Sequence, residues 1–134
     1  MTNEAVLVFE TQLPIPMICS DSTGIEKGTL LKLADPFTAS AAVVRLDICG
    51  GIAAEEKIAS DGKVKIGVYR GGIFKVVASG SITCGDPLVK SVLTTNLVET
   101  AATNEEPIWG IALETVTTGE SLLMELKPMA SQLA

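Results

Sequence analysis

The chain has 134 residues, and 16 acidic side chains against 10 basic ones give it a formal net charge of −6. Phosphate neutralisation needs clustered Lys and Arg, so an acidic chain with scattered basic residues is not expected to bind nucleic acid. Histidine is missing altogether, which excludes Ser–His and Cys–His nucleophile pairs and the usual zinc sites. Hydrophobic residues make up 47% of the chain, yet no stretch approaches the roughly 18 uncharged apolar residues of a membrane span. The apolar surplus therefore suggests surface that is covered by oligomerisation or by a partner.

Residues 1–22 are predicted to form an N-terminal arm or an edge strand. An apolar run at residues 5–9 is followed by Pro14 and Pro16, and proline cannot donate to a strand ladder. The two prolines separate this segment from the pattern of the rest of the chain. The run at residues 5–9 fits two interpretations equally, a core strand or an apolar strip that is contributed to a neighbouring subunit.

Residues 23–127 predict a single all-β domain of short strands and tight turns. The clearest element is VKIGVYRGGIFKVVAS, residues 64–79. It predicts a hairpin around Gly71-Gly72, because only glycine reaches positive φ at both central turn positions without strain. A turn at residues 60–62 extends this hairpin to a three-stranded meander over residues 57–79.

Further strands and one helical turn are predicted on either side of this meander. Residues 53–57 allow one turn of helix, and residues 128–134 are predicted to form a C-terminal tail. Strand character is found at residues 29–34, 42–48, 86–93, 108–114 and 121–127.

The chain also contains an internal echo. TGIEKGTLLKLAD (residues 23–35) resembles SGSITCGDPLVKS (residues 79–91), and GIAAEEK from Gly51 resembles GIALETV from Gly110. The order of these phrases is the same both times, and each series ends in a glycine turn and an alternating strand. We therefore predict two copies of one β unit that close on each other and so remove exposed sheet edges. The glycines predicted to make its structural turns are Gly28, Gly62, Gly71, Gly72, Gly85 and Gly119.

Residues 50–89 and 109–126 resemble the capsid decoration (cement) proteins of tailed bacteriophages. The resemblance rests on G-I-A, a D-G turn, I-G-V-Y, G-I-F and A-S-G-x-I, and it extends over residues 24–127 when the first phrase is included. It implies a small β-barrel of the β-tulip type with an extended N-terminal arm, in a homotrimer that sits on the outer surface of the capsid. The arm itself matches no motif of that family.

The resemblance implies a structural protein of the virion, made in the host cytoplasm, that stabilises the expanded head by bridging adjacent capsomers. Its partners would be the major capsid protein and other copies of itself, with no cofactor, no metal and no catalytic residues. The alternative is a binding module of the virion surface, such as an adhesin or a fibre-base domain. The candidate residues for contact with the capsid or with another subunit are Val6, Leu7, Val8, Phe9, Leu13, Ile15, Met17 and Trp109.

Several side chains invite a chemical interpretation, and a structural one is preferred for each. The acidic pairs at residues 55–56 and 105–106 are predicted to be solvated loops rather than paired catalytic carboxylates. No Asp spacing matches a calcium loop. The three cysteines are odd in number and widely spaced, so they are predicted to be small apolar or inert residues in a reducing compartment. Trp109 is expected either to fill the barrel core or to anchor an interface.

Overall fold

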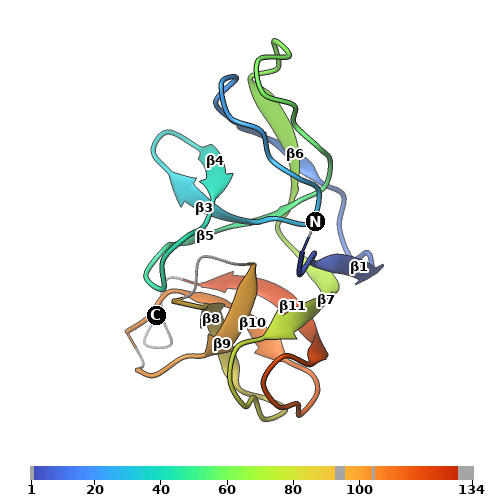
Figure 1. The fold of residues 1–134 in the computed structure, drawn as a ribbon, viewed down its shortest axis with the longest axis vertical. Helices are drawn as coiled ribbons and strands as arrows, with labels where there is room; N and C mark the ends of the chain where they lie inside the picture. The colour runs from blue at the N-terminus through green and yellow to red at the C-terminus, as the bar shows by residue number, and fades with distance from the viewer. Residues whose placement is uncertain (1, 93–95, 104, 130–134) are drawn as a thin grey trace.

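The computed structural model describes residues 2–92, 96–103 and 105–129. Within these ranges the chain forms eleven β-strands, ten of which make up two closed five-stranded barrels that lie one above the other along the long axis (Figure 1). The predicted all-β class and the two-unit barrel are therefore confirmed. None of the described residues belongs to a helix that could cross a membrane.

The first barrel has the strand order β2-β4-β3-β5-β6, and β6 closes the barrel on β2. The pair β2–β4 is parallel and the other neighbouring strands are antiparallel. Residues alternate between core and solvent, as in β6, where Ile66 and Val68 are buried while Lys65 is exposed. The strands are β2 (Ile15–Ile18), β3 (Leu30–Ala34), β4 (Thr38–Ala41), β5 (Cys49–Ala53) and β6 (Lys65–Tyr69).

The second barrel has the order β7-β9-β8-β10-β11, closed between β11 and β7, and it carries β1 as an extra strand beside β7. Its core includes the fully buried Phe74 and Trp109. The strands are β1 (Val6–Phe9), β7 (Gly72–Ala78), β8 (Pro87–Lys90), β9 (Leu97–Thr100), β10 (Ile108–Ala112) and β11 (Ser121–Met129).

The two barrels correspond strand for strand, so the echo in the sequence is a duplication of structure. In both, the first strand pairs in parallel with the third strand and the other pairs are antiparallel. The repeated phrases occupy equivalent places. Gly28 and Gly85 have φ of 85° and 94°, and Leu31 and Leu88, three residues further on, are fully buried. The glycine starts a strand from a tight turn, and the leucine fills the core.

The predicted hairpin around Gly71-Gly72 is wrong. β6 belongs to the first barrel and β7 to the second, and the two strands do not pair, so these glycines connect the barrels. Only Gly72 has positive φ, at 124°, whereas a two-residue type I′ turn needs it at both positions. Residues 57–59 form no strand either, and the meander is therefore absent.

The strand predicted at residues 42–48 is a loop between β4 and β5. Its turn is closed by Asp47, whose carboxylate accepts the backbone N–H groups of Val43 and Val44 at 2.8 and 3.0 Å. A short acidic side chain offers the backbone these bonds in place of a ladder. The helical turn predicted at residues 53–57 is also wrong, since Ala53 ends β5 and residues 54–56 are irregular.

The two ends of the chain differ from their predicted boundaries. Within residues 1–22, β1 is an edge strand, but β2 is an integral strand of the first barrel. Pro14 and Pro16 are accommodated because β4 pairs with β2 only at Ile18. The edge of β2 before Ile18 is therefore unpaired on the side of β4 within the described residues. At the other end β11 continues through Pro128 and Met129, and the rest of the predicted tail, residues 130–134, lies outside the described residues.

Polar contacts join the barrels along their junction. The side-chain amide of Asn96, at the start of β9, accepts the N–H of Leu30 at 2.8 Å and donates to Gly28 O at 2.8 Å. Trp109 donates its indole N–H to Asp47 O at 3.1 Å. One apolar cluster also contains residues of both barrels. The two barrels therefore share a core and form one unit.

Candidate interaction surface

The acidic pairs lie mostly in exposed loops. Glu55, Glu56 and Glu105 are exposed, as predicted for solvated loops. Glu106 is buried, contrary to that prediction, because it pairs with Arg45 through contacts of 3.0 and 3.2 Å. The described residues contain no group of three or more Cys, Asp or Glu side chains placed to hold a metal ion.

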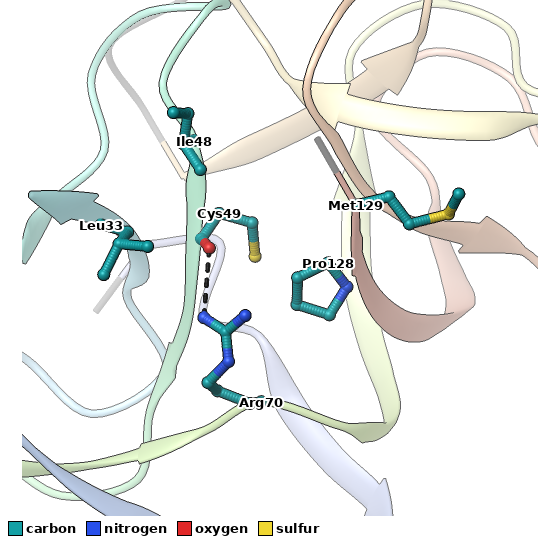
Figure 2. A pocket seen from close by; sticks show the side chains of 6 residues that line it. All are labelled: Leu33, Ile48, Cys49, Arg70, Pro128 and Met129. Atoms are coloured by element: carbon teal, nitrogen blue, oxygen red, sulfur yellow. Dashed lines mark hydrogen bonds between the residues drawn. The ribbon is translucent and has the colours of Figure 1, made fainter. Parts of the chain in front are cut away.

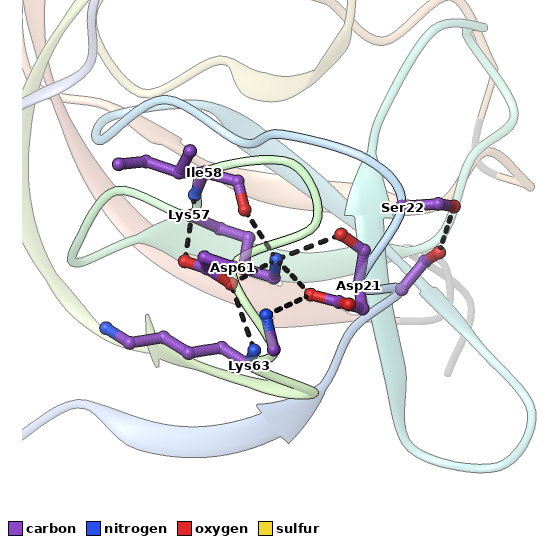
Figure 3. A network of polar contacts seen from close by, with 8 residues as sticks. Asp21, Ser22, Lys57, Ile58, Asp61 and Lys63 are labelled. Carbon is purple, nitrogen blue, oxygen red and sulfur yellow. Dashed lines mark hydrogen bonds and ion pairs between the residues drawn. The ribbon is translucent and has the colours of Figure 1, made fainter.

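The buried ammonium group of Lys57 is the centre of the densest polar network (Figure 3). Its Nζ lies 2.7 Å from Asp61 Oδ1, 3.0 Å from Asp21 Oδ1 and 2.7 Å from the backbone oxygen of Ile58. Burial disfavours the charged form, but the hydrogen bonds to Asp61 and Asp21 outweigh it and raise the pKa of Lys57. The hydrogen bond from Lys57 lowers the pKa of Asp61 to about 2. The shifts of Lys57 and Asp61 both favour the charged pair, so the network holds the turn together.

The cysteines offer no reactive pair among the described residues. Cys19 and Cys49 are buried, and burial raises the pKa of the Cys49 thiol to about 12. Cys84 is exposed, so of the two expectations for it, apolar or inert, the second is the relevant one. Its backbone N–H is held by Thr115 Oγ1 at 3.0 Å. A thiolate needs a nearby cation or base to become a good nucleophile, and no contact of this kind is found for Cys84 among the described residues.

An apolar outer face on the second barrel is the first of two candidate interaction surfaces. Cross-strand pairing places Pro87, Ile111, Glu125, Ile73 and Phe9 in one row across β8, β10, β11, β7 and β1. The next row contains Leu113, Leu123, Lys75 and Val6. All nine are at least partly exposed.

Seven of those nine side chains are apolar, whereas the solvent face of an antiparallel sheet is normally polar. β1 widens this outer face, because Val6 and Phe9 are 47% and 59% exposed and lie opposite the outward-facing Lys75 and Ile73. A contiguous apolar area of this kind usually marks a surface that binds another protein.

The second candidate surface is the β4–β5 loop, residues 42–48, which descends from the first barrel onto the second (Figure 1). Arg45 points into the molecule, where it bonds Glu106, Glu99 and the backbone oxygen of Thr100. Val44 and Leu46 on either side of it are 51% and 66% exposed. The loop thus holds its charged groups inward and displays apolar side chains on a fixed backbone.

A pocket of about 130 Å³ opens beside this loop (Figure 2). Its walls come from both barrels, and Arg70 is fixed at its floor by hydrogen bonds to the backbone oxygens of Cys49 and Gly50 at 3.3 and 3.0 Å. The lining is otherwise mostly apolar. The residues that line the pocket are Leu33, Ile48, Cys49, Arg70, Pro128 and Met129.

The structure divides the predicted contact residues into exposed and buried ones. Val6, Val8, Phe9 and Leu13 are exposed, and Ile15 and Leu7 are partly buried, Leu7 against the core of the second barrel. Met17 and Trp109 are fully buried in the two cores, so the surface contact predicted for them is wrong. Met17 lies inside because β2 is a barrel strand, and Trp109 fills the core, as the first of its two interpretations expected.

Sequence reasoning missed most of the outer face and the exposed loop. The run GIFKVVA of β7 has apolar residues at both alternating sets of positions, which signals a strand covered on both sides. SLLMEL in β11 carries a weaker form of this signal, since Leu123 is the apolar residue among its outward positions. That signal was present, but without the pairing of strands it does not show that the two runs are neighbours.

The described residues form a double barrel that exposes apolar side chains on the outer face of its second barrel and on the β4–β5 loop. No protein family model matches the chain, and no curated protein matches it. Among solved structures it is similar to the N base of the head fibre protein gp8.5 of bacteriophage phi29. That likeness has a TM-score of 0.56 and 16% sequence identity, and it covers 90% of this chain and 96% of that chain. At this identity it shows a shared fold.

Proposed function

We propose that this chain is a structural protein of a phage virion that binds the outside of the head and bridges adjacent capsomers. Two lines support the proposal. The solved structure with a similar fold is the base of a phage head fibre, and the sequence of this chain resembles the capsid decoration proteins. The proposal makes the major capsid protein its partner and assigns the chain no catalytic step, no metal and no cofactor.

The observation that carries the proposal is the fixed apolar loop of residues 42–48. The ion pair of Arg45 with Glu106 fixes the loop while Val44 and Leu46 face solvent. Such a loop suits an attachment site, because a fixed apolar epitope loses little conformational entropy on binding. Bridging needs a second contact as well, and the outer face of the second barrel supplies one.

Stabilisation of the head would follow from mass action. A protein that binds the assembled shell but not its dissociated subunits stabilises the shell in proportion to RT ln(1 + [L]/Kd). If the chain associates into a trimer, three loops bind together, and avidity replaces the need for one strong contact. The loop itself therefore needs only a modest affinity.

The alternative role, a fibre base, is favoured by the nature of the structural neighbour. Both roles need the same attachment to the head, but they differ in consequence. A bridging protein raises the temperature at which heads rupture, whereas a fibre base binds without that effect. Thermal rupture of heads with and without the bound chain separates the two roles.

The test of attachment is co-sedimentation of the purified chain with expanded heads that lack it. The double variant Val44→Asp, Leu46→Asp is expected to lose binding at least about 30-fold, since apolar anchors of interfaces contribute about 2 kcal/mol or more. The matched control is Ile58→Asp, which changes a 68% exposed residue at the far end of the first barrel. Failure of the unaltered chain to sediment with heads would refute the proposal.

The arm is a separate variable in the same assay. A truncation must stop before Pro14, because β2 begins at Ile15 and is part of the first barrel. Deletion of residues 1–12 removes β1 alone. Retained head binding by this truncated chain would assign attachment to the loop, and lost binding with intact barrels would assign it to the arm.

A further inference from the structure

The duplication allows the contact between the two barrels to be compared with surfaces that have no partner within the chain. On the first barrel, Leu30 and Ile52 form an outward-facing pair of β3 and β5. Both are completely buried, because they belong to the apolar cluster that contains Trp109 and Leu126 of the second barrel. The flank of the first barrel therefore covers one end of the second barrel.

The equivalent flank of the second barrel is open. Pro87 pairs with Ile111 across β8 and β10, as Leu30 pairs with Ile52 across β3 and β5. Both residues are partly exposed. The apolar outer face continues from them to Leu113, which directly follows β10. This flank has the chemistry of a barrel–barrel contact but has no barrel against it.

The equivalent end of the first barrel is open in part, because Cys49 is buried in the cluster shared with the second barrel whereas Ile48 next to it is 52% exposed. By strand register, Leu33, Cys49 and Arg70 of the pocket in Figure 2 correspond to residues at the covered end of the second barrel. Those counterparts are all buried beneath the first barrel or within the shared core: Lys90, Ile108 and Leu126. The pocket is thus the place on the first barrel where a flank would dock.

We propose that a second copy of this chain docks the Pro87–Ile111 flank of its second barrel into the pocket formed by Leu33, Ile48, Arg70 and Met129. The contact between chains then repeats the contact within the chain. Every copy of the chain carries both the flank and the pocket, which favours self-association over a foreign partner. Flank and pocket are different surfaces, so the interface is heterologous and builds a ring or a filament rather than a two-fold dimer.

The inference deepens the proposed function by naming the surfaces of self-association, but it is tested without phage heads. Light scattering of the purified chain should give a mass that is a multiple of the 14.0 kDa chain. Ile111→Lys on the flank and Ile48→Lys in the pocket should each weaken self-association at least about 30-fold. Ile58→Lys is the matched control and should leave the mass unchanged. Circular dichroism confirms that each variant is folded, and Leu113→Lys and Met129→Lys replace any that is not.

Mixing the two interface variants gives the decisive result. A heterologous contact predicts that tagged Ile111→Lys captures untagged Ile48→Lys, because the mixture restores one intact flank and one intact pocket. Neither variant should capture an untagged copy of itself. A monomeric unaltered chain would overturn the inference, and so would a mixture that fails to associate. Neither result bears on whether the chain binds heads, which is measured separately by co-sedimentation.

Discussion

The two barrels share one topology but protect the same sheet edge in different ways. In the second barrel, β9 pairs only with the end of β7, and β1 covers the part of that edge that contains Ile73 and Lys75. In the first barrel, β4 pairs only with the end of β2, and no strand of the described residues covers the remainder. The positions of β2 that correspond by register to Ile73 and Lys75 are Pro14 and Pro16.

The two prolines protect this edge because of the side of β2 towards which their backbone nitrogens point. Ile18 donates its N–H to Phe37 O, towards β4, and Cys19 donates to Val64 O, towards β6. Alternation places the nitrogens of Pro14 and Pro16 on the β4 side, where they carry no hydrogen to offer another strand. One edge is covered and the other has no donors, and both solutions prevent unwanted strand pairing.

A second difference lies where the repeated phrases meet the following turn. Ile82 bridges to Val116 in the second barrel, and Ile25 bridges to Lys57 in the first. In the first barrel Lys57, paired with the carboxylates of Asp21 and Asp61, thus occupies the position that Val116 fills in the second barrel. The duplicated scaffold therefore tolerates an apolar or a polar solution at one position, provided that every buried polar group is paired.

The largest expected effect is at the junction of the barrels. Trp109→Ala should lower the free energy of unfolding by about 3–5 kcal/mol, as for other buried large-to-small changes. The residue at the same position of the first barrel is Gly50, so Trp109→Ala gives the corresponding ends of the two barrels side chains of similar size. Trp109→Phe keeps much of the volume and loses chiefly the hydrogen bond to Asp47 O, about 1 kcal/mol. Urea titration measures both, and a loss for Trp109→Ala no greater than for Trp109→Phe would contradict the shared core.

The next effect concerns the polar network of the first barrel. Lys57→Val copies the second barrel but leaves the carboxylates of Asp21 and Asp61 close together without their cation. The melting temperature should fall by several degrees. Lys63→Val is the matched control, since it removes the same charge from an exposed neighbour, and calorimetry should show almost no change for it. Equal shifts for the two variants would show that the network contributes little.

The same network predicts a dependence on acid. Because the folded pKa of Asp61 is about 2 against an ordinary 3.8, its contribution is complete above the ordinary value and is lost as pH falls towards about 2. The melting temperature of the unaltered chain should therefore drop between pH 4 and pH 2, with Asp61→Asn showing a shallower slope over this range. Identical slopes would argue against an ionised pair with Lys57.

The smallest expected effect on stability is at the proline edge. Pro14→Ile with Pro16→Lys copies the second barrel and should change the free energy of unfolding by less than about 1 kcal/mol. It restores two N–H donors to an open edge, so self-association should increase. Introducing the pair in an Ile111→Lys background removes the proposed docking contact, and size-exclusion chromatography then measures the edge alone. An unchanged elution profile would mean that the prolines do not protect this edge.

Local sequence patterns were sufficient for the class and for much of the strand content. The alternation in residues 65–69 and the repeated glycine phrases each predicted what the structure shows, because core-facing periodicity and turn geometry depend on adjacent residues. These local patterns could not predict which strands pair with one another. β6 and β7 read as a hairpin because each has strand character, but their partners are β2 and β5 for one and β1, β9 and β11 for the other.

The interaction surface was harder to predict than the fold, for the same reason. Val44 and Leu46 suggested a strand by composition, but Asp47 closes a turn there, and Arg45 holds the loop in place through Glu106, 61 residues away. The outer face arises from residues of five strands, none of which identifies its neighbours in the sequence. Surfaces of this kind depend on topology, which a single sequence specifies only through long-range contacts.

Electron cryo-microscopy of expanded phage heads, incubated with and without the purified chain, tests the proposed attachment most directly. The account predicts added density on the outside of the shell, in the shape of stacked barrels, with the β4–β5 loop directed at the capsid. Identical outer surfaces in the two preparations would contradict it.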